Sequence, residues 1–136
     1  MKTFPGLISS VAVVAVIGVA CGHSSKSAAS DTKRYCELAR TMAAPPTGID
    51  PATATRDQLK AAAKKHFADH LSDIAELQRV APSAVRADVA VYAAAARHIA
   101  ATGDITEFDT PQNAPAIGRQ EAFDKKTCGI EPPTGP

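Results

Sequence analysis

The chain has 136 residues, of which 45% are hydrophobic and none is tryptophan, and no segment alternates Val, Ile or Thr with polar residues as a β-strand does. These features favour one small all-α domain. The formal net charge is only +1 and falls to about zero without Lys2, so the chain lacks the basic excess that binding to a nucleic acid backbone requires.

Residues 1–20 have the layout of a secretory signal peptide. Lys2 supplies a short positive region, an apolar segment runs from about Leu7 to Val19, and small residues precede Cys21. The apolar segment is shorter than the ~20 residues that a membrane-spanning helix needs. We therefore predict that residues 1–20 are removed during export and that the mature chain lies outside the cytoplasm.

The segment Gly18-Val19-Ala20-Cys21 resembles the lipobox of bacterial lipoproteins. In that family a small residue precedes a cysteine whose sulfur receives diacylglycerol before the signal is cut away. The resemblance implies an acylated Cys21, with fatty acids such as palmitate, and a firm anchor in the cell membrane. Gly18 stands where most lipoboxes carry a large aliphatic residue, and it also fits an ordinary signal peptidase site, so an unacylated secreted chain is the alternative.

Residues 21–30 are small and polar, and we interpret them as a flexible tether to a helical domain over residues 31–128. The first helix is expected to begin after Ser30, a good N-cap, and to run to about Ala44. Its apolar spacing predicts a buried face of Tyr35, Leu38, Ala39 and Met42. Prolines and a glycine in residues 45–51 end this helix.

The next helix has the strongest pattern in the chain. Thr55 and Gln58 form a capping-box motif, and apolar residues then recur at three- and four-residue steps as far as Val80, before Pro82. We predict one continuous helix over this segment. Its expected buried stripe is Leu59, Ala63, Phe67, Leu71, Ile74 and Leu77 or Gln78.

A third helix is expected to follow a short turn and therefore to lie antiparallel to the second. Ser83 is its expected N-cap, and Gly103 is placed to be the left-handed residue after its last turn. Its expected buried stripe is Val85, Val89, Tyr92, Ala96 and Ile99. Alanines 93–96 favour close helix packing and disfavour a large lipid cavity.

The last helix is expected to begin at Asn113, with Pro115 in its first turn, and to run to about Lys126. Its thin apolar stripe is Ile117, Gln120 and Phe123. Residues 129–136 are predicted to be a disordered tail. The whole pattern predicts an all-α bundle of about four helices.

The cysteines connect the two ends of this bundle. With Cys21 used for the lipid, Cys36 and Cys128 remain, and two thiols outside the cytoplasm are expected to join. Without acylation, three cysteines would leave an odd thiol in an oxidising compartment. We therefore predict a disulfide-stapled bundle in which Cys36 is bonded to Cys128.

Three histidines are candidate metal ligands. His66 and His70 are four residues apart on the second helix, and counting outward from the turn puts His98 of the third helix level with His66. Three imidazoles gathered there would suit zinc, another transition metal or haem. The alternative is that all three are ordinary residues at the edge of the apolar stripes.

No motif identifies a reaction. The sequence has no phosphate-binding glycine loop, nucleophile elbow or Cys-x-x-Cys pair, so we do not expect an enzyme. The alanine richness, the lipobox-like start and the two-cysteine body resemble small helical lipoproteins and secreted proteins of actinobacteria. We expect a lipid-anchored protein that binds or scaffolds other envelope proteins, and the alternative function is a metal- or haem-binding carrier. The sequence does not specify an oligomeric state.

Overall fold

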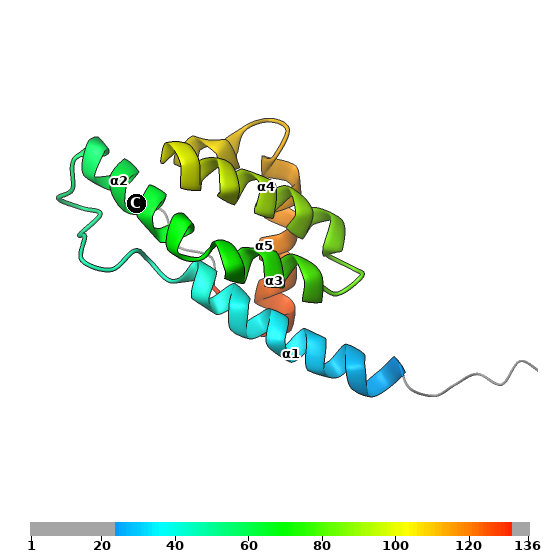
Figure 1. Ribbon diagram of the computed structural model, residues 1–136. Coiled ribbons are helices and arrows are strands. Elements are labelled where there is room, and N and C mark those ends of the chain that lie inside the picture. Colours follow the sequence, from blue (N-terminus) through cyan, green and yellow to red (C-terminus); the bar gives the residue numbers. More distant parts are fainter. Residues whose placement is uncertain (1–23, 132–136) are drawn as a thin grey trace, which may run out of the picture.

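The computed structural model describes residues 24–131, which form five α-helices, one 3-10 helix and no strand (Figure 1). The helices are α1 (Ser24–Ala43), α2 (Arg56–Asp69), α3 (Leu71–Val80), α4 (Arg86–Thr102), η1 (Ile105–Asp109) and α5 (Ala114–Cys128). The predicted all-α fold is confirmed. The predicted signal peptide, Cys21 and most of the predicted tail lie outside the described residues.

Helix α4 is the centre of the arrangement. It packs against α2, α3, η1 and α5, while α1 lies along α3 and also meets α5. Figure 1 shows α1 below α3, α4 above it and α5 crossing behind. No helix within residues 24–131 combines the length and the apolar character that a membrane span needs.

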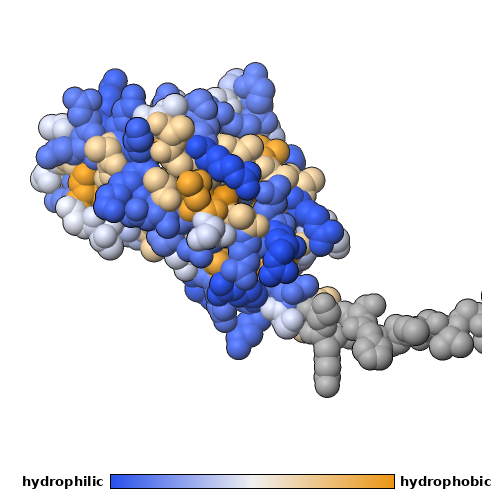
Figure 2. Space-filling model, in the orientation of Figure 1, coloured by the Kyte–Doolittle hydropathy of each residue, from blue (hydrophilic) through white to orange (hydrophobic). Residues whose placement is uncertain are grey.

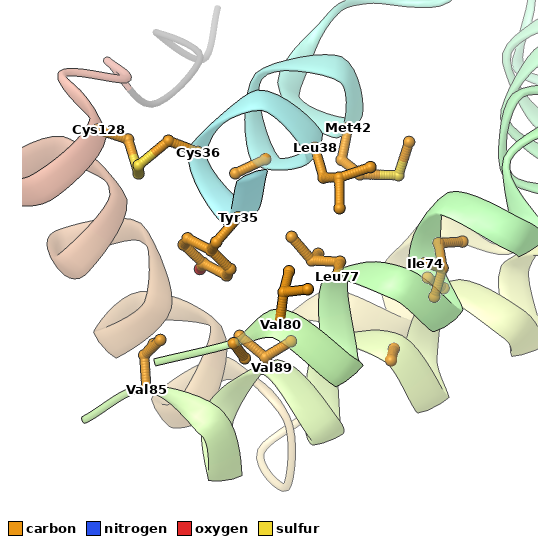
Figure 3. Close-up of a cluster of buried hydrophobic side chains, with 14 of the residues drawn as sticks. Tyr35, Cys36, Leu38, Met42, Ile74, Leu77, Val80, Val85, Val89 and Cys128 are labelled. Carbon is orange, nitrogen blue, oxygen red and sulfur yellow. A yellow bond between two sulfur atoms is a disulfide. The ribbon is translucent and has the colours of Figure 1, made fainter. Parts of the chain in front are cut away.

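The core lies between α1, α3 and α4. Leu38 of α1 lies beside Leu77 of α3, the Tyr35 side chain is directed toward α5, and valines at the start of α4 close the cluster from the other side (Figure 3). The fully buried large side chains are Tyr35, Ile74, Leu77, Val85, Val89 and Ile99. The buried faces predicted for the first and third helices are therefore confirmed, with Tyr92 only half-buried.

Helix α1 begins at Ser24, so its predicted start after Ser30 is wrong. Residues 24–30 contain neither proline nor glycine, and nothing in them interrupts a helix. The Thr32 hydroxyl donates to the Ala28 carbonyl at 2.9 Å, one helical turn earlier. The segment predicted to be a flexible tether is therefore helical from Ser24 onward.

The predicted second helix is two helices, because it breaks at His70. The capping box is confirmed: Gln58 N donates to Thr55 Oγ1 at 3.3 Å, and Thr55 N donates to Gln58 Oε1 at 2.8 Å. At His70 the backbone leaves helical geometry, with φ −110° and ψ 19°. The break turns α3 toward α1, so Leu71, predicted to be buried, is 44% exposed.

Helix α4 ends as predicted and starts later than predicted. Its N-cap is Val85, and Ser83 is an exposed turn residue instead of the cap. Gly103 has φ +79° and follows the last turn, as predicted. A Cβ atom on Gly103 would lie 2.5 Å from the Lys60 carbonyl oxygen, so α2 and α4 approach each other closely at this point.

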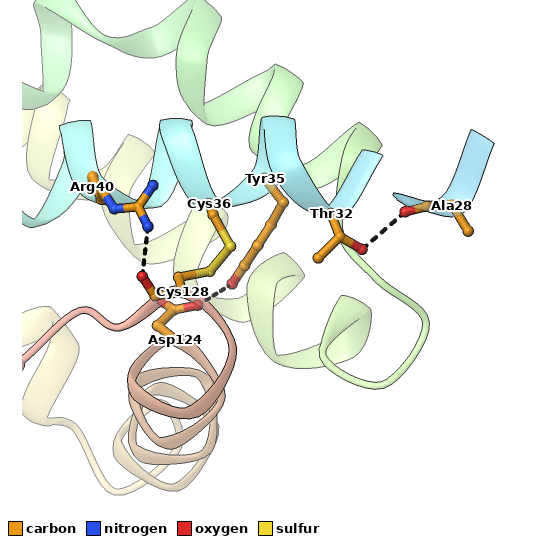
Figure 4. Close-up of a disulfide and its surroundings, with 7 residues drawn as sticks. All are labelled: Ala28, Thr32, Tyr35, Cys36, Arg40, Asp124 and Cys128. Carbon is orange, nitrogen blue, oxygen red and sulfur yellow. Dashed lines mark hydrogen bonds between the residues drawn. A yellow bond between two sulfur atoms is a disulfide. The ribbon is translucent and has the colours of Figure 1, made fainter. Parts of the chain in front are cut away.

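Helix α5 has Asn113 as its N-cap and a proline in its first turn, as predicted, and runs two residues past Lys126 to Cys128. Gly129, with φ +66°, ends it. The predicted disulfide is confirmed, with an S–S distance of 2.01 Å between Cys36 and Cys128 (Figure 4). The Arg40 guanidinium donates to the Cys128 carbonyl at 2.6 Å, which adds a polar contact beside the disulfide.

The face of the domain shown in Figure 2 is mostly hydrophilic. Small groups of hydrophobic residues lie in the middle of the face shown in Figure 2, and hydrophilic residues surround them. The exposed large hydrophobic residues of the described chain are Leu71, at 44%, and Ile105, at 49%. Leu71 is exposed by the helix break, whereas Ile105 belongs to the cavity described next.

Candidate functional site

A cavity of about 390 Å³ lies where α1, α2, α4, η1 and α5 meet. Three rings from three elements form its wall: Phe67 of α2, Tyr92 of α4 and Phe108 of η1. The Phe108 ring stacks on Tyr92 with centroids 5.3 Å apart, and it meets Phe67 edge-on at 5.6 Å. We call this cavity the aromatic groove. Its other apolar lining residues are Ala39, Met42, Ala43, Ile105, Ile117 and Ile130.

The polar lining of the aromatic groove is acidic. It contains no Lys, Arg or His residue. Its polar members are four carboxylates and one amide: Asp109, Glu121, Asp124, Glu131 and Gln120. Glu131 is paired with Lys125 at 2.7 Å, whereas Asp109 and Glu121 form no ion pair with the described residues. The groove therefore combines an aromatic wall with uncompensated negative charge at its edge.

Asp124 is the most buried of these carboxylates. It accepts a hydrogen bond of 2.6 Å from the Tyr35 hydroxyl of α1 (Figure 4). Burial raises the pKa of Asp124, while the bond from Tyr35 acts in the opposite direction and the neighbouring Glu121 raises the pKa further. Burial also raises the pKa of the Tyr92 phenol, and the negative charge of Asp124 adds to that effect.

Gln120 lies in the groove wall beside Asp124. Its residue is only 6% exposed, and its side-chain oxygen Oε1 accepts no hydrogen bond. The amide lowers the pKa of Asp124, as a neighbouring donor does. Buried polar atoms are nearly always paired in folded proteins, so a buried acceptor without a donor requires an explanation.

His66 and His70 lie together, as predicted, with ring centroids 5.0 Å apart. They line a separate cavity of about 400 Å³ between the end of α1 and α2. The Nδ1 atom of His70 is 2.8 Å from an Asp73 carboxylate oxygen. Burial lowers the pKa of His66, the charge of His70 lowers it further, and the Nε2 atom of His66 has no hydrogen-bond partner.

His98 does not join this pair. Its side chain is 52% exposed and faces Glu107 of η1, with Nε2 3.9 Å from the carboxylate. Within residues 24–131, no three His, Cys, Asp or Glu side chains are arranged to hold a metal ion. Of the three candidate ligands, the structure therefore brings together His66 and His70 but not His98. Counting residues from the turn gave the height of His98 along α4 but not the direction in which its side chain points.

The sequence reasoning missed the aromatic groove. Its wall depends on Phe108, which lies in a short 3-10 helix between the predicted third and last helices, where no helix was predicted. An isolated aromatic residue among polar neighbours was the one local signal. The acidic residues of the edge are spread over η1 and α5 and the segment after it, so no motif joins them.

The fold and the groove define a class of protein: a small all-α domain with one disulfide and an acidic, aromatic-walled groove between its helices. In comparisons with known proteins, the chain matches no family model, no curated protein and no solved structure. The groove itself must therefore supply the argument for function.

Proposed function

We propose that this chain is a lipid-anchored protein of the cell envelope that binds an apolar ligand in the aromatic groove. The observation that supports the proposal is the groove, whose volume of about 390 Å³ falls within the range of small-molecule sites. Three aromatic rings converge on it from elements far apart in the sequence. Apolar walls with a few polar groups at the edge are typical of ligand sites.

Binding fits the groove better than catalysis does. Covalent catalysis by Ser, Cys or Lys needs an activated nucleophile, with a base or a lowered pKa beside it. None of these three residue types lines the groove, and Asp124 already accepts the hydrogen bond of Tyr35. The groove offers contact area and charge, which serve recognition.

The location in the envelope is part of the same proposal. Its supports are the lipobox-like segment at Cys21 and the Cys36–Cys128 disulfide, a bond typical of oxidising compartments. Helix α1 begins three residues after Cys21 and reaches the groove at Ala39 and Met42. Measured along α1, the groove at Met42 lies roughly 27 Å from Ser24, and Cys21 precedes Ser24 by three residues.

Mass spectrometry of the exported chain under non-reducing conditions tests the anchor. We expect a mature chain that starts at Cys21 and carries diacylglycerol, with two hydrogens missing because of the disulfide. A Cys21→Ser variant is expected to lose the lipid and keep the disulfide. An unlipidated parent chain would overturn the anchor and leave a secreted binding protein.

Fluorescence of the neutral dye N-phenyl-1-naphthylamine tests the groove. The matched variants are Ile105→Ser and Leu71→Ser, because both residues are large, apolar and about equally exposed, and only Ile105 lines the groove. We expect Ile105→Ser to weaken dye binding about threefold to tenfold and Leu71→Ser to leave it unchanged. No binding by the parent, or equal loss in both variants, would contradict the proposal.

A metal or haem carrier is the second candidate. One observation favours it: the contact of His70 with Asp73 resembles the support that a carboxylate gives to a metal-binding histidine. Because His98 faces Glu107 instead, His66 and His70 are the two candidate histidine ligands that lie together. A zinc titration by calorimetry tests this candidate, and heat that is the same for the parent and for His66→Ala would contradict it.

A further inference from the structure

We infer that the ligand of the aromatic groove is a small amphiphile with an apolar body and a positively charged ammonium group. This inference rests on the proposed binding function and adds the charge of the ligand. It follows from three separate features of the groove: the negative charge of its polar lining, the unpaired acceptor in its wall and its aromatic lining.

The negative charge of the groove is local and does not reflect the charge of the whole chain. The whole chain is almost neutral, whereas the polar edge of the groove is formed by four carboxylates without a basic lining residue. Lys125 compensates Glu131, and Tyr35 donates to Asp124. Asp109 and Glu121 form no ion pair with the described residues, and no basic residue lines the groove, so a cation is favoured there over an anion.

The wall also contains an acceptor that lacks a donor. Gln120 is buried in the groove lining, and its side-chain oxygen receives no hydrogen bond. A carboxylate or phosphate ligand brings only acceptors to this wall. An ammonium group brings N–H donors and no acceptor. Of these ligand classes, only the ammonium ion combines a positive charge, which suits the carboxylates, with donors and no acceptor.

The rings supply the third feature. Tyr92 and Phe108 are stacked with their planes only 5° apart, and they line the same groove as the carboxylates. Aromatic faces attract ammonium ions through their quadrupole, and their apolar surface accepts a hydrocarbon body. The groove thus offers a place for each half of a cationic amphiphile.

Three probes with the same ten-carbon chain test the inference: decylammonium, decanol and decanoate. Each probe is added to the exported chain carrying Cys21→Ser, and its displacement of bound N-phenyl-1-naphthylamine is measured. The substitution removes the acylation site and leaves residues 24–131 unchanged. We expect decylammonium to displace the dye at a concentration at least about tenfold lower than decanol, and decanoate to be the weakest. The preference for decylammonium over decanol is expected to decrease at high salt, because salt screens the attraction between charges.

The carboxylates are tested with Asp109→Asn combined with Glu121→Gln. This double variant is expected to lose the preference for decylammonium over decanol. Glu37→Gln, which removes a carboxylate from the exposed side of α1 outside the groove, is the control and is expected to keep the preference. A preference that persists in the double variant would overturn the role of these two residues.

The outcomes separate the two proposals. Equal displacement by all three probes would overturn the inference about charge and leave the binding function in place. Stronger displacement by decanoate would overturn it in the same way. Failure of every probe and of the dye to bind would overturn the binding function itself.

Discussion

Tyr35 is fully buried, and its hydroxyl donates to Asp124 across the same pair of helices that the disulfide joins. Burial is the main reason that the pKa of Asp124 is raised, because a charged carboxylate is less stable in a poorly hydrated site. Asp124 therefore couples the protonation of one side chain to the contact between α1 and α5.

The sign of this coupling gives a pH prediction. Because its pKa is raised in the folded state, Asp124 contributes stability that is fully present below the unfolded pKa and is lost as the pH rises through the folded pKa. Asp124→Asn removes this titration while its amide oxygen still accepts from Tyr35. As the pH rises above about 4, the usual pKa of an aspartate, we expect the free energy of unfolding of the variant to increase relative to that of the parent.

Urea denaturation at a series of pH values measures the difference. The control is Asp57→Asn, which changes an exposed carboxylate at the start of α2. Parallel pH profiles for Asp124→Asn and the parent would contradict the prediction.

Gly103 determines how closely α2 and α4 pack. It has a positive φ, and an added Cβ would collide with the backbone of Lys60. Gly129 also has a positive φ, but nothing lies within 4 Å of its added Cβ. We expect Gly129→Ala to cost about 1 to 2 kcal/mol from backbone strain alone. Gly103→Ala is expected to cost a further 1 to 3 kcal/mol, roughly, because α2 and α4 must move apart.

Thermal and chemical unfolding of the two glycine variants checks this difference. Both variants change one glycine to alanine at a positive φ, so the unfolded chains are matched. Equal losses of stability would show that the close approach at Lys60 has no energetic effect.

Phe67 and Leu71 stand in one apolar stripe in the sequence, and the break at His70 separates their environments. Phe67 is 8% exposed and Leu71 is 44% exposed. We expect Phe67→Ala to lower the free energy of unfolding by about 3 to 5 kcal/mol and Leu71→Ala to change it by less than about 0.5 kcal/mol. Urea denaturation measures both, and a large loss for Leu71→Ala would mean that the helix is continuous in solution.

The helices were predictable from sequence wherever a local residue determines an end. Thr55 with Gln58 acts through hydrogen bonds, and Gly103 acts through its backbone angles, each within one turn. The break at His70 was not predictable in this way, because no proline or glycine marks it. It depends on α2 packing against α4 while α3 packs against α1, which is a property of the assembled fold.

At the scale of the whole molecule, one covalent bond joins the first helix to the last. The disulfide links residues 92 positions apart, and loops of this size are worth about 4 to 5 kcal/mol in the chain-entropy account. We expect Cys36→Ser combined with Cys128→Ser to lower the melting temperature far more than a surface substitution does. Calorimetry with and without a reductant measures the effect.

The control for the disulfide variant is the parent chain after reduction, which is expected to melt close to the double variant. Cys21→Ser is expected to melt like the oxidised parent, because it leaves the disulfide intact. An unchanged melting curve for the double variant would contradict the stabilising role of the bond.

The aromatic groove could not be predicted from the sequence because it depends on how the helices are arranged in space. Its lining comes from five helices, and residues from Ala39 to Glu131 contribute to it. Periodicity reports which face of one helix is buried, and it gives no distance between helices. The disulfide was predictable because only one pairing of cysteines is left when Cys21 is reserved for the lipid, whereas aromatic and acidic residues had many possible neighbours.

The position of the disulfide also determines how the domain responds to mechanical tension. A pull applied between the two ends of the chain enters through α1, crosses the Cys36–Cys128 bond and leaves through Gly129. The helices between the cysteines, and most of the groove with them, lie outside this loaded path. In force spectroscopy the oxidised domain is expected to lengthen only by the segments before Cys36 and after Cys128. Reduction of the disulfide is expected to release about 300 Å of additional chain, because the two cysteines are 92 residues apart.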